Sequence, residues 1–217
     1  MKKNTNEIEQ DLSQLITEQR NENSFNIDSK SVEEIIEIFN TEDQKAVSAV
    51  IKEKDNIAKA VSMIVESFKR GGRLFYVGAG TSGRLGVLDS AECPPTFGVD
   101  REMVQGIIAG GYEALVRSIE RAEDKPEDGA SAIIERGIDS KDTVVGIASS
   151  GRTPFVMGAL EEAKRLGAGT VLLQCNPLRI KIPYVDVFIL PIVFLVLHLS
   201  YGIGSIWGLL CLVRIKR

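Results

Sequence analysis

Two short segments of this chain combine glycines with hydroxyl side chains, and each follows a run of apolar residues. The first is Gly80-Thr81-Ser82-Gly83 and the second is Ser149-Ser150-Gly151-Arg152-Thr153. Glycines let backbone N–H groups approach an anion, hydroxyls donate further hydrogen bonds, and a helix that starts there adds partial positive charge. Because ligands of open parallel sheets sit outside the carboxyl ends of the strands, the two segments predict one site for a phosphorylated sugar.

The first segment also fits the dinucleotide pattern Gly-x-Gly-x-x-Gly, through Gly78, Gly80 and Gly83. A dinucleotide site needs an acidic residue about 20 positions further on, at the end of the second strand, to hold the ribose. The second predicted strand ends instead in Ala109-Gly110-Gly111. A dinucleotide site would also leave the second hydroxyl segment without a role, so a sugar phosphate is favoured. The alternative that both segments are simple turns stays open at this point.

Predicted strands and helices alternate around the two segments. Apolar runs typical of strands occur at residues 74–77, 104–109, 143–148 and 171–174, and helical patterns occur at 85–88, 113–121, 128–136 and 155–166. We expect Pro94-Pro95 to end the first of these helices. The alternation predicts an α/β fold, a three-layer sandwich with a mostly parallel sheet that helices cover on both faces.

Helices are also expected before the first strand. Ser31 and Glu34 have the spacing of a capping box, and Thr41 begins a second capping signal. Apolar residues then recur every three or four positions across residues 47–68, which predicts one long amphipathic helix. Gly71-Gly72 would end that helix as a C-terminal glycine cap.

Composition narrows the range of partners. The chain has 217 residues and a net charge of −4, without the basic excess that a nucleic-acid partner requires. Cys93, Cys175 and Cys211 share no metal-ligand spacing, and with the single His198 they predict no zinc site. We interpret the three cysteines as reduced thiols, and the stretch from Met1 to Arg20 is polar without an apolar signal region, so we expect a cytoplasmic protein.

Several blocks of the sequence resemble the N-acetylmuramic acid 6-phosphate etherases. They are GAGTSGRLG (78–86), DSAECPPT (89–96), IAGG (108–111), RAED (121–124) and ASSGRTP (148–154). The resemblance runs from about Ile27 to Val193. It implies a sugar isomerase (SIS) domain, a homodimer, and cleavage of the D-lactyl ether of N-acetylmuramic acid 6-phosphate to N-acetylglucosamine 6-phosphate and D-lactate. It implies no metal and no cofactor, because the elimination runs on proton transfer alone.

The resemblance also implies two catalytic carboxylates. Glu92 would protonate the departing lactate oxygen, and Glu123 would remove the proton at sugar C2. From the residues alone, Glu92 stands beside Cys93 in a rigid proline turn, and Glu123 is typical of a solvated helix face. Two other functions stay open: a non-catalytic sugar-phosphate-binding regulator of the same fold, such as the glucokinase-regulator relatives, and a sugar-phosphate isomerase.

The resemblance stops abruptly after Val193. We expect residues 1–55 to form an N-terminal arm and helical segment, residues 56–193 an incomplete SIS-type sugar-phosphate-binding domain, and residues 194–217 a divergent apolar tail. Residues 187–213 form a run of 27 residues without a formal charge, long enough to span a bilayer. The run begins as a buried strand at 187–190, and we interpret the tail as an out-of-frame or truncated end rather than a membrane anchor.

Overall fold

The computed structural model describes residue 17, residues 19–176 and the backbone of residues 186–189. The predictions for the tail 194–217 lie outside these described residues. Within them, no helix combines the length and the apolar character needed to cross a bilayer.

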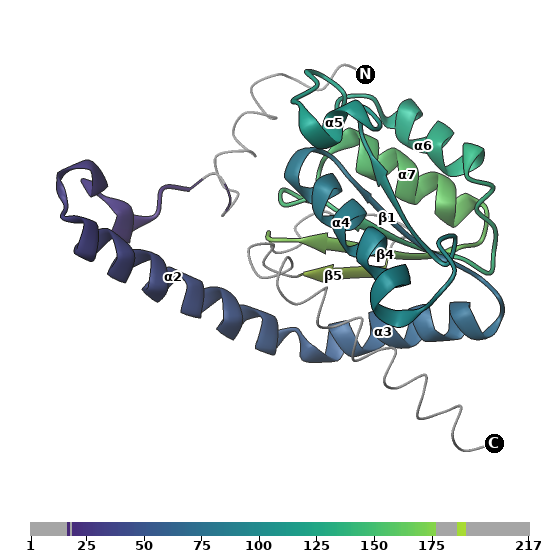
Figure 1. Ribbon diagram of the computed structural model, residues 1–217, viewed down its shortest axis with the longest axis horizontal. Helices are drawn as coiled ribbons and strands as arrows, with labels where there is room; N and C mark the ends of the chain where they lie inside the picture. The colour runs from purple at the N-terminus through teal and green to yellow at the C-terminus, as the bar shows by residue number, and fades with distance from the viewer. Residues whose placement is uncertain (1–16, 18, 177–185, 190–217) are drawn as a thin grey trace, which may run out of the picture.

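A five-stranded parallel sheet forms the centre of the fold (Figure 1). Its strands are β1 (Leu74–Gly78), β2 (Val104–Ile108), β3 (Thr143–Ile147), β4 (Gly169–Gln174) and β5 (Asp186–Ile189). They lie in the order β2-β1-β3-β4-β5, and every neighbouring pair is parallel. Gly78 at the end of β1 is level with Ile108 of β2 and Ile147 of β3, so these three strands end together.

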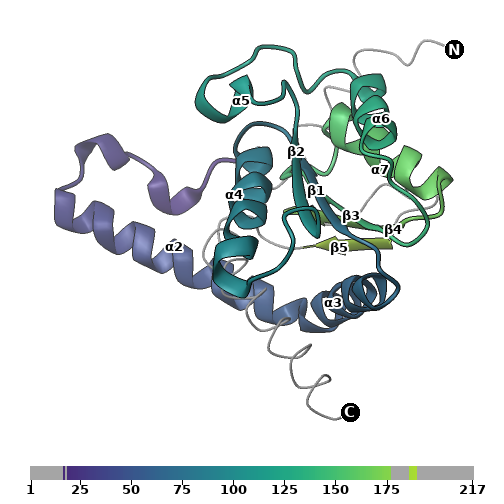
Figure 2. The ribbon, with the colours of Figure 1, turned by 45° about the vertical axis from the view of Figure 1, so that its right-hand side comes forward.

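Helices cover both faces of the sheet (Figure 2). On one face lie α3 (Lys54–Lys69) and α4 (Gly80–Phe97), and on the other lie α6 (Pro126–Glu135) and α7 (Pro154–Arg165). Successive side chains of a strand point to opposite faces, so Leu74 and Tyr76 join the core under α3 and α4, whereas Phe75 and Val77 join the core under α6 and α7. The predicted α/β three-layer sandwich is confirmed.

The N-terminal helices extend away from the sheet (Figure 1). Two 3-10 turns, η2 (Glu22–Ser24) and η3 (Ile27–Ser29), precede α2 (Val32–Lys52). The predicted capping box is confirmed, since the N–H of Glu34 donates to Ser31 Oγ at 3.2 Å and the N–H of Ser31 donates to Glu34 Oε2 at 2.7 Å. The second capping signal is wrong, because the Thr41 hydroxyl donates to the Glu37 carbonyl one turn back and the helix continues.

The predicted long helix over residues 47–68 is divided at Glu53. Its N–H donates to the Val50 carbonyl in a tighter turn at 3.0 Å, and the chain changes direction between α2 and α3. The predicted glycine cap is confirmed: α3 ends at Lys69, and Gly71 adopts the left-handed conformation with φ 74°.

Two prolines lie inside the last turn of α4, where we expected them to end the helix earlier. That expectation is wrong. Each proline removes a backbone donor, so α4 lacks two backbone hydrogen bonds near its end, yet the helix continues to Phe97. The N–H of Gly98 donates to the Pro94 carbonyl at 2.8 Å, and Gly98 closes the helix with φ 66°. Glu92 therefore lies on a helix and not in a proline turn.

The helix expected over residues 113–121 is shorter than predicted. The structure has α5 (Glu113–Val116), after which Arg117 is extended. The Arg84 side chain donates to the carbonyls of Leu115 at 3.1 Å and Arg117 at 3.0 Å. A side chain from α4 thus satisfies carbonyls that a longer helix would have used internally.

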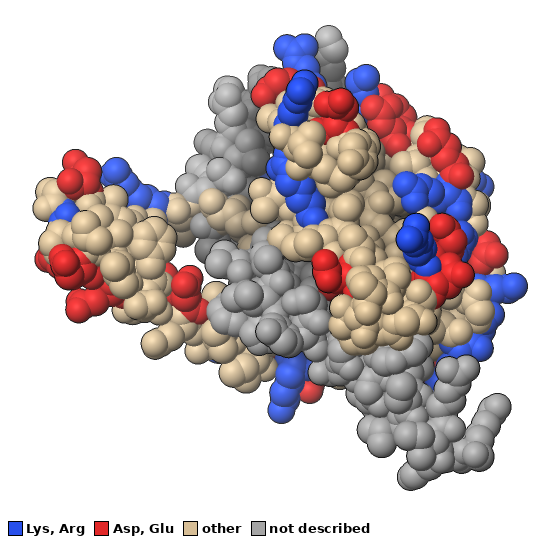
Figure 3. All heavy atoms as spheres, in the orientation of Figure 1, with Lys and Arg blue, Asp and Glu red and all other residues tan. Residues whose placement is uncertain are grey.

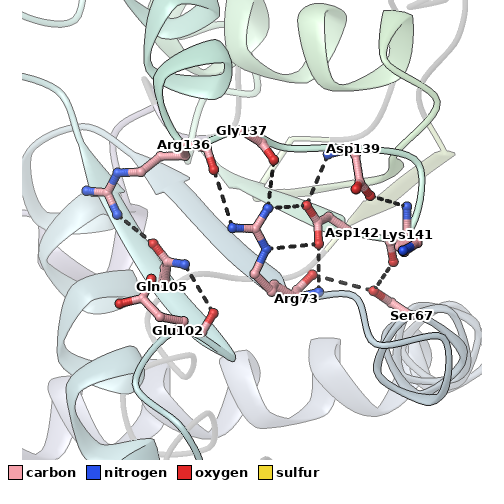
Figure 4. Close-up of polar contacts among 9 residues, drawn as sticks. All are labelled: Ser67, Arg73, Glu102, Gln105, Arg136, Gly137, Asp139, Lys141 and Asp142. Atoms are coloured by element: carbon pink, nitrogen blue, oxygen red, sulfur yellow. Dashed lines mark hydrogen bonds and ion pairs between the residues drawn. The ribbon is translucent and has the colours of Figure 1, made fainter.

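A polar network joins the elements at the amino edge of the sheet, opposite the hydroxyl segments (Figure 4). Arg73 precedes β1 and forms an ion pair with the buried Asp142 before β3, at 2.8 Å from Nη2 to Oδ2. Arg73 also donates its backbone N–H to Asp142 Oδ1 at 2.7 Å and Nη2 to the Gly137 carbonyl at 2.8 Å. The hydrogen bonds that the Arg73 guanidinium donates to Asp142 raise its pKa. This network fixes the strand starts and takes no part in the site described next.

Candidate functional site

The first hydroxyl segment lies at the carboxyl end of β1 and forms the first turn of α4. The helix begins at Gly80, with φ 53°, so the expected loop with a helix starting near residue 85 is corrected. The first helical backbone bond runs from the N–H of Gly83 to the Ala79 carbonyl at 3.2 Å. The N–H groups of Gly80, Thr81 and Ser82 have no hydrogen-bond partner among the described residues. Free N–H groups at a helix start form an anion-binding position.

The outer glycines of this segment are required by packing. A Cβ atom on Gly83 would lie 2.6 Å from Ile108 Cγ1, and a Cβ atom on Gly78 would lie 2.6 Å from the Gly83 nitrogen. Both distances are shorter than real Cβ contacts. The glycines thus allow the start of α4 to sit directly on the ends of β1 and β2, which fixes where its free N–H groups point.

The second hydroxyl segment connects β3 to α7. The N–H of Cys175 donates to the Ser149 carbonyl at 2.9 Å, which extends the β3–β4 pairing beyond the strands. Gly151 turns the chain with φ 71°, and the N–H of Arg152 donates to Ser150 Oγ at 3.2 Å. Thr153 precedes α7 without a side-chain cap hydrogen bond.

The sheet brings the two segments together. Their strands, β1 and β3, are direct neighbours. The chain runs outward from β1 to β2 on one side and from β3 to β4 on the other. Ligands of open α/β sheets bind at such a switch point. The predicted sugar-phosphate residues Gly80, Thr81, Ser82 and Gly83 thus lie at the same edge as Ser149, Ser150, Gly151, Arg152 and Thr153.

Glu123 lies beside the second segment. It is exposed in the connection between α5 and α6, and its carbonyl accepts the N–H of Phe155 in the first turn of α7 at 3.0 Å. α6 and α7 pack closely there: a Cβ atom on Gly158 would lie 2.0 Å from the Pro126 carbonyl oxygen. Glu123 is therefore held at the carboxyl edge, where a carboxylate can meet a bound sugar.

Glu92 lies on the exposed side of α4, away from the hydroxyl segments of the same chain. It follows Gly80 by twelve residues. At 1.5 Å per residue the two positions are about 18 Å apart along the helix axis. The structure thus brings Glu123 to the two segments and leaves Glu92 at a distance from them within one chain.

A buried polar group lies between α4 and β1, and sequence reasoning missed it. Burial raises the pKa of the Asp89 carboxyl to about 6, although the hydrogen bond with Tyr76 acts in the opposite direction. Burial also raises the pKa of the Cys93 thiol to about 12, with Asp89 and Glu92 adding to the effect. Asp89 and Cys93 share a helix face at a spacing of four, which was the signal available in the sequence.

Gln174 is a second residue that sequence reasoning missed. It is the last residue of β4, its side chain is buried, and a Cβ atom on Gly151 would lie 1.7 Å from Gln174 Oε1. The amide therefore lies directly against the turn of the second segment. No sequence pattern distinguishes it from a strand residue. Among the described residues, no group of three or more His, Cys, Asp or Glu side chains could hold a metal ion.

Comparisons with known proteins give close relatives. The chain is 55% identical over 166 residues to the N-acetylmuramic acid 6-phosphate etherase of Clostridioides difficile (76% of this chain, 55% of the relative). It is 58% identical over 168 residues to the etherase of Salinibacter ruber (77% of this chain, 54% of the relative). The chain spans about half the length of these curated relatives.

Solved structures share the fold. A phosphoheptose isomerase from Francisella tularensis matches with a TM-score of 0.54 and 16% identity, over 80% of this chain and 96% of that one. A phosphoheptose isomerase from Neisseria gonorrhoeae matches with a TM-score of 0.56 and 12% identity, over 80% of this chain and 97% of that one.

A family model described as the glucokinase regulatory protein N-terminal SIS domain matches residues 56–164, half of the chain. The matched range contains β1, the start of α4, β3 and the second hydroxyl segment. The chain therefore belongs to this family of SIS domains.

Proposed function

We propose that this protein is a lyase that cleaves the D-lactyl ether of N-acetylmuramic acid 6-phosphate, in the recycling or catabolism of cell-wall amino sugars. The observation that carries the proposal is the identity of 55–58% to proteins named as this etherase, over a region that includes both hydroxyl segments. The site geometry supports it, because free N–H groups and hydroxyls converge at one edge of the sheet, as a phosphate ligand requires.

The two hydroxyl segments contribute different groups to the binding of the sugar phosphate. The free N–H groups of Gly80, Thr81 and Ser82 bind the phosphate at the start of α4, where the helix dipole favours negative charge. The hydroxyls of Ser149, Ser150 and Thr153 bind sugar or phosphate oxygens from the second segment, and the Arg152 guanidinium pairs with the phosphate. Thr81 and Ser82 add their own hydroxyls.

The chemistry is elimination followed by addition of water. Glu123 removes the proton at C2, which lies next to the aldehyde of the open-chain sugar. The C3–O bond breaks, and Glu92 gives its proton to the departing oxygen, so that D-lactate leaves and a C2–C3 double bond remains. Water then adds across that bond to give N-acetylglucosamine 6-phosphate. Proton transfer of this kind needs an acid and a base, and no cofactor or metal.

A homodimer is the assembly that we propose for this reaction. Apolar side chains remain exposed on α4 and at α5, which Arg84 joins to the start of α4. Leu88, one turn before Glu92, is 52% exposed, Tyr112 before α5 is 83% exposed and Val116 in α5 is 72% exposed. A second copy packed on this face would bury these side chains and would also cover Glu92, which is exposed to solvent in a single chain. We expect Leu88→Arg to shift the protein from dimer to monomer in sedimentation equilibrium.

We assign the reaction to the cytoplasm, with small molecules as the partners. Cys93 is a buried free thiol, as in a reducing compartment. On the face shown in Figure 3, basic and acidic side chains are interspersed over the sheet domain, a distribution that suits a small ligand better than a nucleic acid.

A second candidate is a sugar-phosphate-binding regulator without catalysis. Two observations favour it: the matching family model carries the name of a regulatory protein, and Glu92 lies far from the hydroxyl segments of its own chain. A regulator needs the binding segments and neither glutamate.

The test is D-lactate release from N-acetylmuramic acid 6-phosphate by the chain, beside Glu92→Gln and Glu123→Gln. The etherase predicts release by the parent protein and a loss of at least about a hundredfold in each variant. Binding of the sugar phosphate without release would support the regulator. Release that both variants retain would refute the assigned roles of the glutamates.

A further inference from the structure

The Nε2 donor of the Gln174 amide, at the site, has no partner in the part of the chain that the structure describes. Gln174 is 4% exposed, and its Nε2 has no hydrogen-bond partner among the described residues. The neighbouring Asn176 is equally buried, but its Nδ2 donates to Thr17 Oγ1 at 3.1 Å and to the Ser149 carbonyl at 3.3 Å. A buried amide donor is costly to leave without an acceptor, so the Gln174 donor indicates an acceptor that the described residues do not provide.

The position of this amide is tied to the second hydroxyl segment. A Cβ atom on Gly151 would lie 1.7 Å from Oε1 and 2.8 Å from Cδ of Gln174, so the side chain packs against the Gly151 backbone. The Ala148 N–H bonds to the Leu173 carbonyl and the Cys175 N–H bonds to the Ser149 carbonyl, which hold Gln174 level with the segment. Any ligand in the turn of Ser150 and Gly151 is therefore next to the amide.

Three other buried side chains have an oxygen atom without a partner in the described part of the chain, and none lies at this edge. Thr143 and Thr170 begin β3 and β4 at the opposite edge, and Asp89 lies under α4. Thr170 shares a strand with Gln174, which makes it a matched control for the effect of an unpaired buried polar atom.

We propose that Gln174 is a further ligand-binding residue of the SIS site, whose Nε2 donates to an oxygen of the sugar phosphate held by the second segment. The inference rests on the proposed function, because it requires a sugar phosphate at that segment. The ligand gives the buried donor its missing acceptor, and Gly151 is the residue without a side chain that allows the amide to come so close.

The test measures binding and stability in the same set of variants. Gln174→Met keeps the length of the side chain and removes the donor, Gln174→Glu keeps the shape and replaces the donor by an acceptor, and Thr170→Val is the control. Titration calorimetry with N-acetylglucosamine 6-phosphate measures binding, and thermal unfolding without ligand measures stability.

We expect Gln174→Met to weaken binding by roughly tenfold to a hundredfold, the effect of one hydrogen bond to a charged ligand. Gln174→Glu weakens it further, since a carboxylate repels the phosphate. The midpoint of unfolding of Gln174→Met without ligand stays the same or rises, because the unpaired donor is gone. Thr170→Val binds like the parent chain.

Three results would overturn the inference. If the parent chain binds and both Gln174 variants bind equally well, Gln174 is not a ligand residue, and the proposed function stands. If Gln174→Met loses stability without ligand in proportion to binding, the residue serves packing alone. If the parent chain binds no sugar phosphate, the proposed function and this inference are both wrong.

Discussion

Replacing Asp89 by Asn should change the stability of the protein in a pH-dependent way. Asp89 is 4% exposed on the inner side of α4, and its Oδ2 has no partner among the described residues. Burial raises the pKa of this carboxyl from 3.8 to about 6, and the Tyr76 hydrogen bond opposes the rise. Asparagine has nearly the same shape, still accepts a hydrogen bond from Tyr76, and carries no charge at any pH.

The direction of this pH effect depends on whether the folded or the unfolded chain binds the Asp89 proton more tightly. A carboxyl with a raised pKa binds its proton more tightly in the folded chain than in the unfolded one. It therefore adds stability below about pH 4, and this contribution is lost as the pH rises through 6. The difference between 3.8 and about 6 corresponds to about 3 kcal/mol. Asp89→Asn should thus gain up to about 3 kcal/mol over the parent chain between pH 4 and pH 7.5.

The assay is urea unfolding of both proteins at several pH values from 4 to 7.5. The difference between the two free energies of unfolding is the quantity of interest, since the other titrating groups cancel. Tyr76→Phe is the matched control: it removes the hydrogen bond that lowers the pKa of Asp89, so the pH dependence should become steeper than in the parent chain. A difference that stays constant, or that falls as the pH rises, would refute the reasoning.

Substitutions at three further positions test the amino-edge network, the start of α4 and the cap of α2. Asp142→Ala should lower the free energy of unfolding by about 3 kcal/mol, because it leaves Arg73 without its buried partner. Asp142→Asn should lower it by less, and urea unfolding would measure both variants. Gly83→Ala should lower the free energy of unfolding by about 1–3 kcal/mol in the same assay, because its Cβ atom would lie 2.6 Å from Ile108 Cγ1. It should also weaken phosphate binding. An unchanged stability would contradict the close packing of α4. Ser31→Ala removes the cap of α2, so it should lower the free energy of unfolding by about 1 kcal/mol and reduce the helix content measured by circular dichroism. An unchanged spectrum would count against that cap.

The sequence was sufficient for the features that depend on local patterns. The apolar runs predicted the first four strands, and the hydroxyl segments lie after β1 and β3, as the sequence pattern indicated. The capping box at Ser31 was likewise readable, because its two hydrogen bonds join residues three apart.

Features that depend on tertiary contacts could not be predicted in this way. The prolines at 94 and 95 suggested a helix end, but Gly98 beyond them closes α4, and Glu92 is helical as a result. α5 is short because Arg84, distant in sequence, takes its carbonyls. The Gln174 side chain at the end of β4 packs against the Gly151 backbone in the connection after β3, and only the folded chain brings these residues together.

The most direct test of the central claim, that the two hydroxyl segments form one sugar-phosphate site, compares N-acetylglucosamine 6-phosphate with N-acetylglucosamine by titration calorimetry. We expect the chain to bind the phosphorylated sugar and not the other, and Ser82→Ala and Ser150→Ala each to weaken binding by about tenfold. Equal binding of the two sugars, or binding that neither substitution changes, would contradict it.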